Sequence, residues 1–285
     1  MGSETAATAP HINGVLPEHR YAACANGYRM HYIDQGEGPV LVWLHGSGPG
    51  ASGHSNFKGN YPVIADAGYR CIVIDIVGFG FSDKPEGETY TLDFFVECVS
   101  QTLDVLGVSA CSVVGNSLGG AIALGLALAE PERVEKLILM APGGLSPMAE
   151  YPQMPGMQKM FAVYGSGEPV TPAVMKDLFA FGLMHDPVHA TDALVAERMQ
   201  IMALMNGQVM SSMQIPELTT RLPELRCPVL GFWGLNERMM PDSGIMNFAK
   251  NCSQLQLVLV SECGHWVMVE HQDLFNRHCL EFLSR

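Results

Sequence analysis

The sequence predicts an α/β fold with a mostly parallel central sheet and helices on both of its faces. Short apolar runs alternate with helical patterns along most of the chain, which is typical of this class. The chain has 285 residues, of which 48% are hydrophobic and 16% are charged, so it can bury a large core. We therefore expect one α/β core that carries an insertion.

Six apolar runs are predicted as strands of the sheet, and a hairpin precedes them. The hairpin pairs residues 20–25 with residues 28–34 around the turn Asn26-Gly27. The strands are expected at residues 40–44, 71–76, 110–114, 137–140, 229–233 and 255–260. Helical patterns are found at residues 61–67, 92–106, 118–129, 244–250 and 271–283.

A long segment without a strand pattern separates the strand at 137–140 from the strand at 229–233. We predict that residues 145–215 form a helical lid over a core of residues 1–144 and 216–285, at the sheet edge where open α/β folds bind ligands. Each methionine of the lid either lines a ligand site with a deformable apolar side chain or fills space between helices. These residues are Met148, Met154, Met157, Met160, Met175, Met184, Met199, Met202, Met205, Met210 and Met213.

Charge and cysteine usage restrict the partners and the compartment. A net charge of −13 argues against nucleic acid, because phosphate backbones are bound by clustered Lys and Arg. No apolar run reaches the roughly 18 residues of a membrane span, and the first residues lack the pattern of a secretory signal. The eight cysteines show no Cys-x-x-Cys spacing, which is typical of reduced core thiols. We expect a cytoplasmic protein that binds neither nucleic acid nor membranes.

The most informative motif lies between a predicted strand and a predicted helix and reads Gly115-Asn116-Ser117-Leu118-Gly119. Gly-x-Ser-x-Gly at such a junction is a nucleophile elbow, in which small neighbours leave room for a strained turn that exposes the serine. The N-terminus of the following helix can stabilise an oxyanion. Ser117 is therefore predicted as the nucleophile, and a glycine-rich turn without chemistry is the alternative.

A serine nucleophile needs a base and an orienting acid. His265 follows the last predicted strand, where the histidine of an α/β-hydrolase triad lies. The acid should follow the strand at 229–233, where the usual Trp-Gly-x-x-Asp pattern has Glu237 in place of aspartate. Glutamate can also hold the imidazole tautomer, so Glu237 is predicted as the acid, with Asp242 as the alternative.

The oxyanion hole needs two backbone N–H groups. Leu118 supplies one, and Ser47 or Gly48 is expected to supply the other from the glycine-rich loop after residues 40–44. His45, at the start of this loop, is interpreted as a buried structural residue.

These motifs resemble those of the meta-cleavage product hydrolases, a family of α/β-hydrolases from bacterial aromatic degradation. The resemblance lies in the Gly-Asn-Ser elbow, in Gly264-His265-Trp266 and in the loop His45-Gly46-Ser47-Gly48-Pro49-Gly50-Ala51. It implies hydrolysis of a C–C bond in a 2-hydroxy-6-oxohexa-2,4-dienoate to 2-hydroxypenta-2,4-dienoate and a carboxylic acid. The resemblance also implies that no cofactor and no metal is used.

The resemblance further implies which residues bind the substrate. Asn56 and Asn116 match positions that hydrogen-bond the dienoate end, and Arg198 matches the arginine that pairs with its carboxylate. An exposed helix residue paired with a nearby acid is the alternative for Arg198. Trp266 matches an aromatic residue beside the base, and Phe179 and lid methionines are expected to line an apolar half that accepts an alkyl or aryl group.

The small-molecule substrate is expected to be bound by a homodimer or a larger homo-oligomer. Two other functions use the same fold. A carboxylesterase would use the same serine, base and acid without an arginine for a carboxylate. A non-catalytic binding protein would keep the pocket and lose the triad, and the intact Ser117 and His265 count against it.

Overall fold

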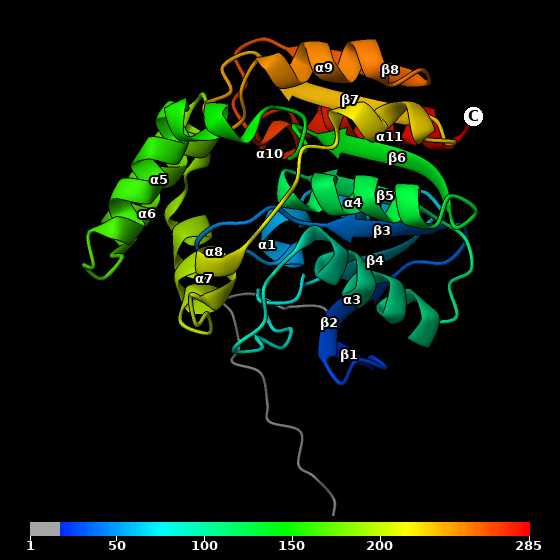
Figure 1. Ribbon diagram of the computed structural model, residues 1–285, viewed down its shortest axis with the longest axis horizontal. Coiled ribbons are helices and arrows are strands. Elements are labelled where there is room, and N and C mark those ends of the chain that lie inside the picture. Colours follow the sequence, from blue (N-terminus) through cyan, green and yellow to red (C-terminus); the bar gives the residue numbers. More distant parts are fainter. Residues whose placement is uncertain (1–17) are drawn as a thin grey trace, which may run out of the picture.

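An eight-stranded sheet forms the centre of the computed structural model, which describes residues 18–285 (Figure 1). The strand order is β1-β2-β4-β3-β5-β6-β7-β8, with antiparallel pairs β1–β2 and β2–β4 and parallel pairs elsewhere. The strands are β1 (Arg20–Ala23), β2 (Arg29–Gln35), β3 (Val40–Leu44), β4 (Arg70–Ile74), β5 (Cys111–Asn116), β6 (Val134–Met140), β7 (Val229–Gly234) and β8 (Leu255–Val260). The predicted hairpin and all six further predicted strands are confirmed.

The helices between the strands match the predicted ones and include two that were not predicted. They are α1 (Gly53–Phe57), α2 (Tyr61–Asp66), α3 (Leu92–Val105), α4 (Leu118–Ala129), α5 (Pro155–Gly165), α6 (Pro172–Leu178), α7 (Asp192–Met202), α8 (Gln208–Ser212), α9 (Ser243–Asn251), α10 (Val267–Glu270) and α11 (Gln272–Leu283). Short helical turns lie at η1 (Met148–Gln153), η2 (Phe179–Leu183), η3 (Pro187–His189) and η4 (Thr219–Glu224). The unpredicted α1 and α10 are too short to show a helical period.

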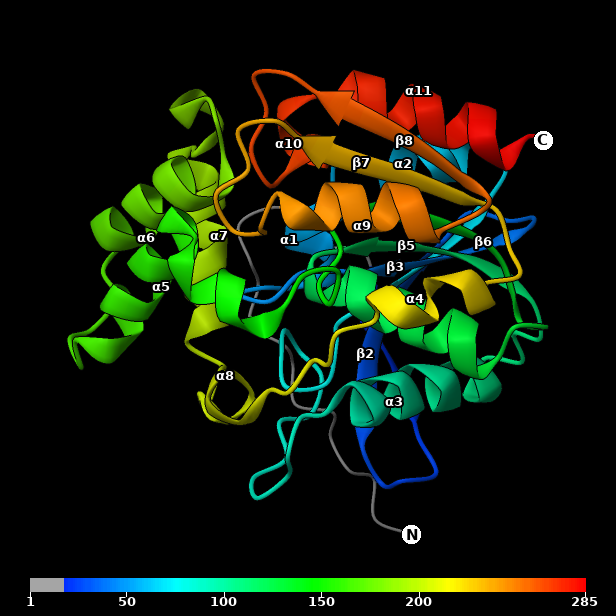
Figure 2. The ribbon, with the colours of Figure 1, turned by 45° about the horizontal axis from the view of Figure 1, so that its top comes forward.

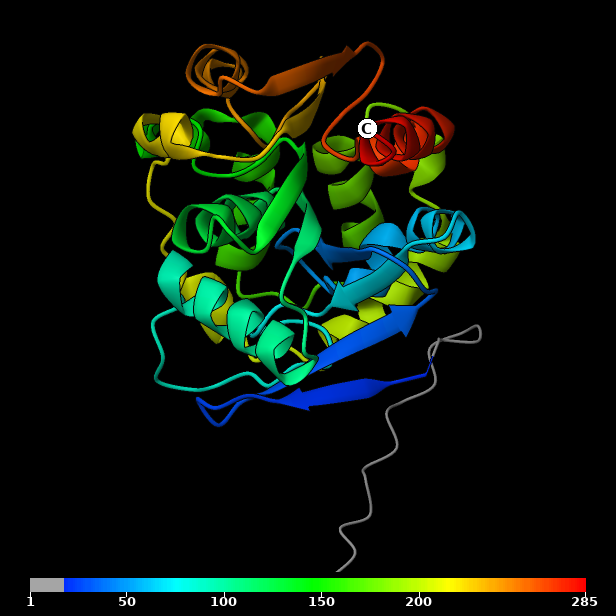
Figure 3. The ribbon, with the colours of Figure 1, turned by 90° about the vertical axis from the view of Figure 1, so that its right-hand side faces the viewer.

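The sheet separates two apolar clusters, as expected for a sheet covered on both faces. Helices α3, α4 and α9 cover one face, and α2 and α11 cover the other (Figure 3). Adjacent residues of β3 point to opposite sides, so Trp43 belongs to one cluster and Leu44 to the other. The two clusters hold the strands rigidly, and the loops at their carboxyl ends are therefore well positioned.

The segment between β6 and β7 carries helices α5 to α8 and no strand of the sheet within its described residues. In Figures 1 and 2 these helices lie together beyond the ends towards which β7 and β8 point. The exact limits of the predicted lid stay a prediction, and the first seventeen residues of the predicted core lie outside the described residues. None of the described helices is long and apolar enough to cross a membrane.

Candidate active site

Ser117 lies at the sharp turn between β5 and α4. Its φ of 54° and ψ of −115° are unusual for a residue with a side chain, as a nucleophile elbow requires. A Cβ on Gly119 would lie 2.0 Å from the Leu44 carbonyl oxygen, and one on Gly115 would lie 2.4 Å from the Gly119 carbonyl oxygen. Within the described residues the Ser117 hydroxyl accepts no capping hydrogen bond from α4, so its oxygen is not occupied by the helix.

His265 and Glu237 come together from the loops that follow β8 and β7. Nδ1 of His265 lies 2.6 Å from Oε2 of Glu237, and both residues are buried. The other carboxylate oxygen of Glu237 accepts the N–H groups of Arg238, at 2.8 Å, and Met239, at 2.7 Å. Asp242, the alternative acid, is exposed beside α9. The structure therefore pairs His265 with Glu237, and no side chain or backbone group of residues 18–285 is hydrogen-bonded to Nε2 of the imidazole, which can accept a proton.

The loop after β3 lies directly beside the nucleophile. A Cβ on Gly46 would lie 3.3 Å from the Ser117 Cβ, and Ser47 and Leu118 line a cavity with Ser117. Gly48 is not among the residues that line it. The contribution of each N–H group to an oxyanion hole stays a prediction.

His45 holds this loop in place from within the core. Its Nε2 accepts the Ile76 N–H at 3.0 Å, so Nδ1 carries the proton and donates to the Gly46 carbonyl at 2.7 Å. Burial lowers the pKa of His45 to about 4, so the imidazole is neutral near neutral pH. This agrees with the predicted structural role.

Asn116, Asn56 and Arg198 form a buried chain of hydrogen bonds that begins beside the nucleophile. The Asn56 side-chain amide donates to Oδ1 of Asn116 at 3.4 Å, and Arg198 donates to Oδ1 of Asn56 at 2.5 Å. Arg198 also donates to the Pro49 carbonyl at 3.5 Å. The cluster connects α1 and α7, which are distant in sequence, to the nucleophile elbow.

Arg198 is 1% exposed, so its alternative interpretation as an exposed helix residue is wrong. Its guanidinium lies 4.9 Å from the ring centroid of Trp266 and 5.6 Å from that of Phe179. Burial lowers the pKa of Arg198 to about 10, which still leaves it charged at neutral pH. Among the described residues it forms no ion pair with a carboxylate, and its Nε has no hydrogen-bond partner. The nearest acid, Glu197, pairs with Lys58 instead. A buried cation without a directly bonded carboxylate is suited to an anionic ligand.

An apolar cavity of about 290 Å³ opens beside Ser117 and His265. From the segment between β6 and β7 it is lined by Met148, Met157, Met160, Phe161, Met210 and Met213. Met239 and Met240, from the loop that carries Glu237, complete the wall. The sequence did not predict them, because no local pattern places this loop against the insertion. The expectation for Phe179 is wrong: it does not line this cavity and packs against Trp266, with ring centroids 5.5 Å apart.

Comparisons with known proteins agree with this geometry. The family model of the α/β hydrolase fold matches residues 39–272. A 2-hydroxy-6-oxononadienedioate/2-hydroxy-6-oxononatrienedioate hydrolase of Burkholderia vietnamiensis is 36% identical over 268 residues, which cover 90% of this chain and 91% of the relative. A 2-hydroxy-6-oxo-6-phenylhexa-2,4-dienoate hydrolase of Burkholderia cepacia is 34% identical, with 91% and 92% covered. The chain belongs to the meta-cleavage product hydrolases.

A solved member of this family has the same overall fold. The meta-cleavage product hydrolase of Pseudomonas fluorescens IP01 superimposes with a TM-score of 0.82 at 27% identity, over 93% of this chain and 97% of that chain. That structure is of a serine-to-alanine variant complexed with acetates. The resemblance inferred from the motifs is thus confirmed at the level of family and fold.

Asp75 supports the polar side of this hydrolase and was not singled out from the sequence. Its carboxylate accepts the N–H of Gly53 at 2.7 Å and that of Phe81 at 2.9 Å, and it contacts His31 at 2.8 Å. Burial alone would raise the pKa of Asp75, but His31 and the hydrogen bonds hold it well below its ordinary value. Asp75 fixes the start of α1, which carries Asn56. The signal in the sequence was a charged residue between Ile74 and Ile76.

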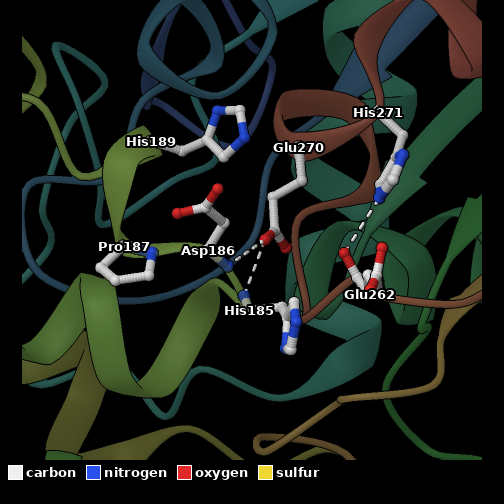
Figure 4. A pocket seen from close by; sticks show the side chains of 7 residues that line it. All are labelled: His185, Asp186, Pro187, His189, Glu262, Glu270 and His271. Atoms are coloured by element: carbon white, nitrogen blue, oxygen red, sulfur yellow. Dashed lines mark hydrogen bonds between the residues drawn. The ribbon is translucent and has the colours of Figure 1, made fainter.

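A second hollow, of about 450 Å³, lies on the surface where the segment between β6 and β7 meets the loop after β8. Figure 4 shows the Glu270 carboxylate in its wall, pointing at the backbone of His185 and Asp186. Glu270 accepts their N–H groups at 2.7 Å and 2.9 Å, and its other oxygen accepts the Gly264 N–H at 2.7 Å. Neither Ser117 nor His265 lines this hollow.

Proposed function

We propose that this protein hydrolyses the C–C bond between C5 and C6 of a 2-hydroxy-6-oxohexa-2,4-dienoate. The products are 2-hydroxypenta-2,4-dienoate and a carboxylic acid. The observation that carries the proposal is the combination of a serine hydrolase site with a buried Arg198 that has no direct ion pair among the described residues and is connected to the nucleophile elbow through Asn56 and Asn116. A simple ester needs the first feature alone, whereas a dienoate needs both. Relatives named as hydrolases of such dienoates support the same reaction.

The polar cluster prepares the substrate for cleavage. Arg198 pairs with the carboxylate, and Asn56 and Asn116 hydrogen-bond the oxygen on C2. Their amides stabilise the keto form at C2 while a proton is added at C5. This tautomer is required because the electron pair of the broken C5–C6 bond can then pass through the C3–C4 double bond to the C2 oxygen. Trp266 lies over the guanidinium and fixes its plane.

Ser117 and His265 then break the C5–C6 bond. His265 takes the Ser117 hydroxyl proton at Nε2 as the oxygen attacks the C6 ketone, while Glu237 stabilises the imidazolium. The N–H groups of Leu118 and of Ser47 or Gly48 stabilise the oxyanion. Collapse of this intermediate expels the dienolate, which takes the proton from the His265 imidazolium and leaves as the dienol, while the acyl group stays on Ser117. Water, deprotonated by His265, hydrolyses that ester and restores the serine.

The test is the loss of the yellow dienolate colour when the pure protein meets alkyl and aryl 2-hydroxy-6-oxohexa-2,4-dienoates. We expect rapid loss with the wild type and none with Ser117→Ala. Cleavage of simple esters without any cleavage of dienoates would replace the proposal by a carboxylesterase. Colour loss that persists in Ser117→Ala would remove the serine from the mechanism.

We further propose that the protein is a cytoplasmic homo-oligomer, a dimer or larger, and that residues 145–215 act as the lid of its site. All eight cysteines are buried and free, which supports a reducing compartment. Edge strand β8 presents Leu259, which is 48% exposed, and an apolar edge of this kind favours association. Light scattering on the purified protein tests the oligomer.

A further inference from the structure

The cavity beside Ser117 and His265 has an uncharged lining, and membership of the family does not by itself predict this. Apart from His265, the described side chains that line it carry no charge: none is Lys, Arg, Asp or Glu. Polar groups are few, and two of them are already bonded to the protein. Tyr151 accepts the Gly144 N–H at 3.0 Å, and Ser146 is bonded to Ser243 at 2.9 Å. The wall opposite the nucleophile is therefore a hydrocarbon and thioether surface.

The charges behind this wall would repel an anion. Ser243, the partner of Ser146, donates its one hydroxyl proton to the Glu150 carboxylate at 2.5 Å, so Ser146 donates to Ser243 and an acid lies two hydrogen bonds behind the lining. The two cations closest in sequence to the lining residues are bonded to other groups and do not line the cavity. Lys159 pairs with Asp177, at 2.5 Å, and Arg238 donates to the Phe181 carbonyl at 2.9 Å. A carboxylate at this end of a ligand would lose its hydration without gaining a counter-charge.

We propose, resting on the proposed function, that the group on C6 of the substrate is an uncharged hydrocarbon of up to aryl size. The substrate named for the Burkholderia vietnamiensis relative is a dioate, which carries a second carboxylate. This chain excludes that charge. The cavity of about 290 Å³ exceeds the roughly 150 Å³ that encloses benzene in an engineered protein. Methionine sulfurs also make favourable contacts with aromatic rings, and they are abundant in this wall.

The experiment compares kcat/KM for 2-hydroxy-6-oxo-6-phenylhexa-2,4-dienoate with kcat/KM for 2-hydroxy-6-oxononadienedioate. We expect the phenyl substrate to be preferred by about a hundredfold or more, because burying an unpaired carboxylate is costly. Equal rates, or a preference for the dioate, would overturn the inference and leave the proposed function intact. Cleavage of neither, together with turnover of simple esters, would instead contradict the proposed function.

A charge placed in the wall should reverse the discrimination. Met213→Arg puts a cation into the lining at a half-buried position, and we expect the ratio of phenyl to dioate activity to fall at least tenfold. Met205→Arg is the matched control, because Met205 is also half-buried but does not line this cavity. Phe161→Lys, at a position 51% exposed, provides a second lining cation that does not depend on Met213→Arg folding. An unchanged ratio in both lining variants would refute the inference.

A second inference rests on a different observation, the Glu270 carboxylate at the far side of the base. Glu270 accepts the Gly264 N–H on one oxygen and two N–H groups of the η2–η3 segment on the other. A backbone carbonyl at the end of η2 also contacts the loop that carries His265. The Leu183 oxygen accepts the N–H groups of His265, at 2.9 Å, and Trp266, at 3.2 Å. Figure 4 shows Glu270 between α10 and the η2–η3 segment. The backbone of residues 264–266 is thus held by α10, through Gly264, and by the insertion, through His265 and Trp266.

We infer that Glu270 is a positioning residue that keeps the His265 imidazole in line with Glu237 and Ser117. A carboxylate can accept all three N–H groups, whereas a glutamine would direct its own N–H₂ at some of them. Glu270→Gln should therefore release the loop. Glu262→Gln is the matched control, since Glu262 lines the same hollow but bonds His271 through its backbone carbonyl.

The measurements are kcat, KM and the downfield NMR resonance of the His265 Nδ1 proton. In Glu270→Gln we expect kcat to fall about ten- to a hundredfold with little change in KM, and the resonance to shift or broaden. The Glu262→Gln variant should retain the wild-type values of all three. A wild-type resonance in Glu270→Gln would overturn the inference, even if that variant were less stable, because the base would then be held without Glu270.

Discussion

Glu237 lies 2.6 Å from His265, and its second oxygen accepts two consecutive backbone N–H groups. The carboxylate is thus fixed by its own loop before it meets the imidazole. Since glutamate is one methylene longer than aspartate, the two N–H bonds limit where the longer chain can place its carboxylate. This explains how a glutamate occupies the position where the motif expects an aspartate.

Replacing Glu237 by Gln should lower kcat for dienoate hydrolysis by about 10³- to 10⁴-fold, because the amide cannot stabilise the imidazolium and favours the wrong tautomer. Asp242→Asn should leave kcat within about twofold of the wild type, since Asp242 is exposed and its side chain caps no described N–H group of α9. Steady-state kinetics on both variants show which of the two carboxylates is the acid of the triad. The reverse pattern would assign the acid to Asp242.

Replacing Arg198 by Gln should lower kcat/KM for dienoates by about thirtyfold or more, because at least about 2 kcal/mol of buried charge pairing is lost. Hydrolysis of a neutral ester should change little, since its acyl group needs no cation. Measuring both activities on one preparation controls for folding. A parallel loss of both would mean that Arg198 serves the structure and not the carboxylate.

Gly50 makes a close contact between the loop after β3 and α7. Its φ is +61°, and a Cβ there would lie 2.0 Å from the Arg198 carbonyl oxygen. Gly50→Ala should destabilise the fold by about 2 to 4 kcal/mol, from backbone strain and overpacking together. Gly107→Ala is the control, because its φ of +66° is similar and nothing described lies within 4 Å of the added Cβ.

The Gly107→Ala control should cost only about 1 to 2 kcal/mol, the part due to the backbone. Urea unfolding of both variants measures the difference. Equal losses would show that the loop can move away from α7 at little cost.

His45 should make folding stability depend on pH. Burial lowers its pKa to about 4 in the folded state, against about 6.5 when unfolded. Between these values the unfolded chain binds the proton and the folded chain does not, so stability is lost as the pH falls. The loss is about 2 kcal/mol between pH 6.5 and 5.

The comparison variant is His45→Gln, whose side-chain oxygen can still accept the Ile76 N–H. Its unfolding free energy, measured in urea, should fall less over the same pH range than that of the wild type. An identical pH dependence in the two proteins would contradict the neutral, buried state of His45.

Most of the core could be predicted from the sequence, because buried parallel strands are continuous apolar runs. The start of β6 shows the limit of this signal. It begins at Val134, three residues before the predicted strand, and its second residue is the exposed Glu135. Where one face of a strand is exposed to solvent, polar and apolar residues alternate. That part of the strand is not a continuous apolar run, so the apolar pattern does not predict it.

The nucleophile, base and acid could be located because each follows a strand at a fixed point of the chain. The walls of the cavity could not be assigned in this way. Phe179 and Met239 are both apolar residues near the site, yet only Met239 lines the cavity. Which side of a short helix or loop faces a ligand depends on packing between segments distant in sequence, and no local pattern records it.

The apolar wall and the reacting groups come from different stretches of the chain. Most of the wall is supplied between β6 and β7, whereas Ser117 and His265 follow β5 and β8. Side-chain substitutions in the methionines of the insertion can therefore accumulate with little movement of the serine or its partners. In a lineage exposed to new aromatic compounds, the range of substrates can therefore evolve while the catalytic mechanism is retained.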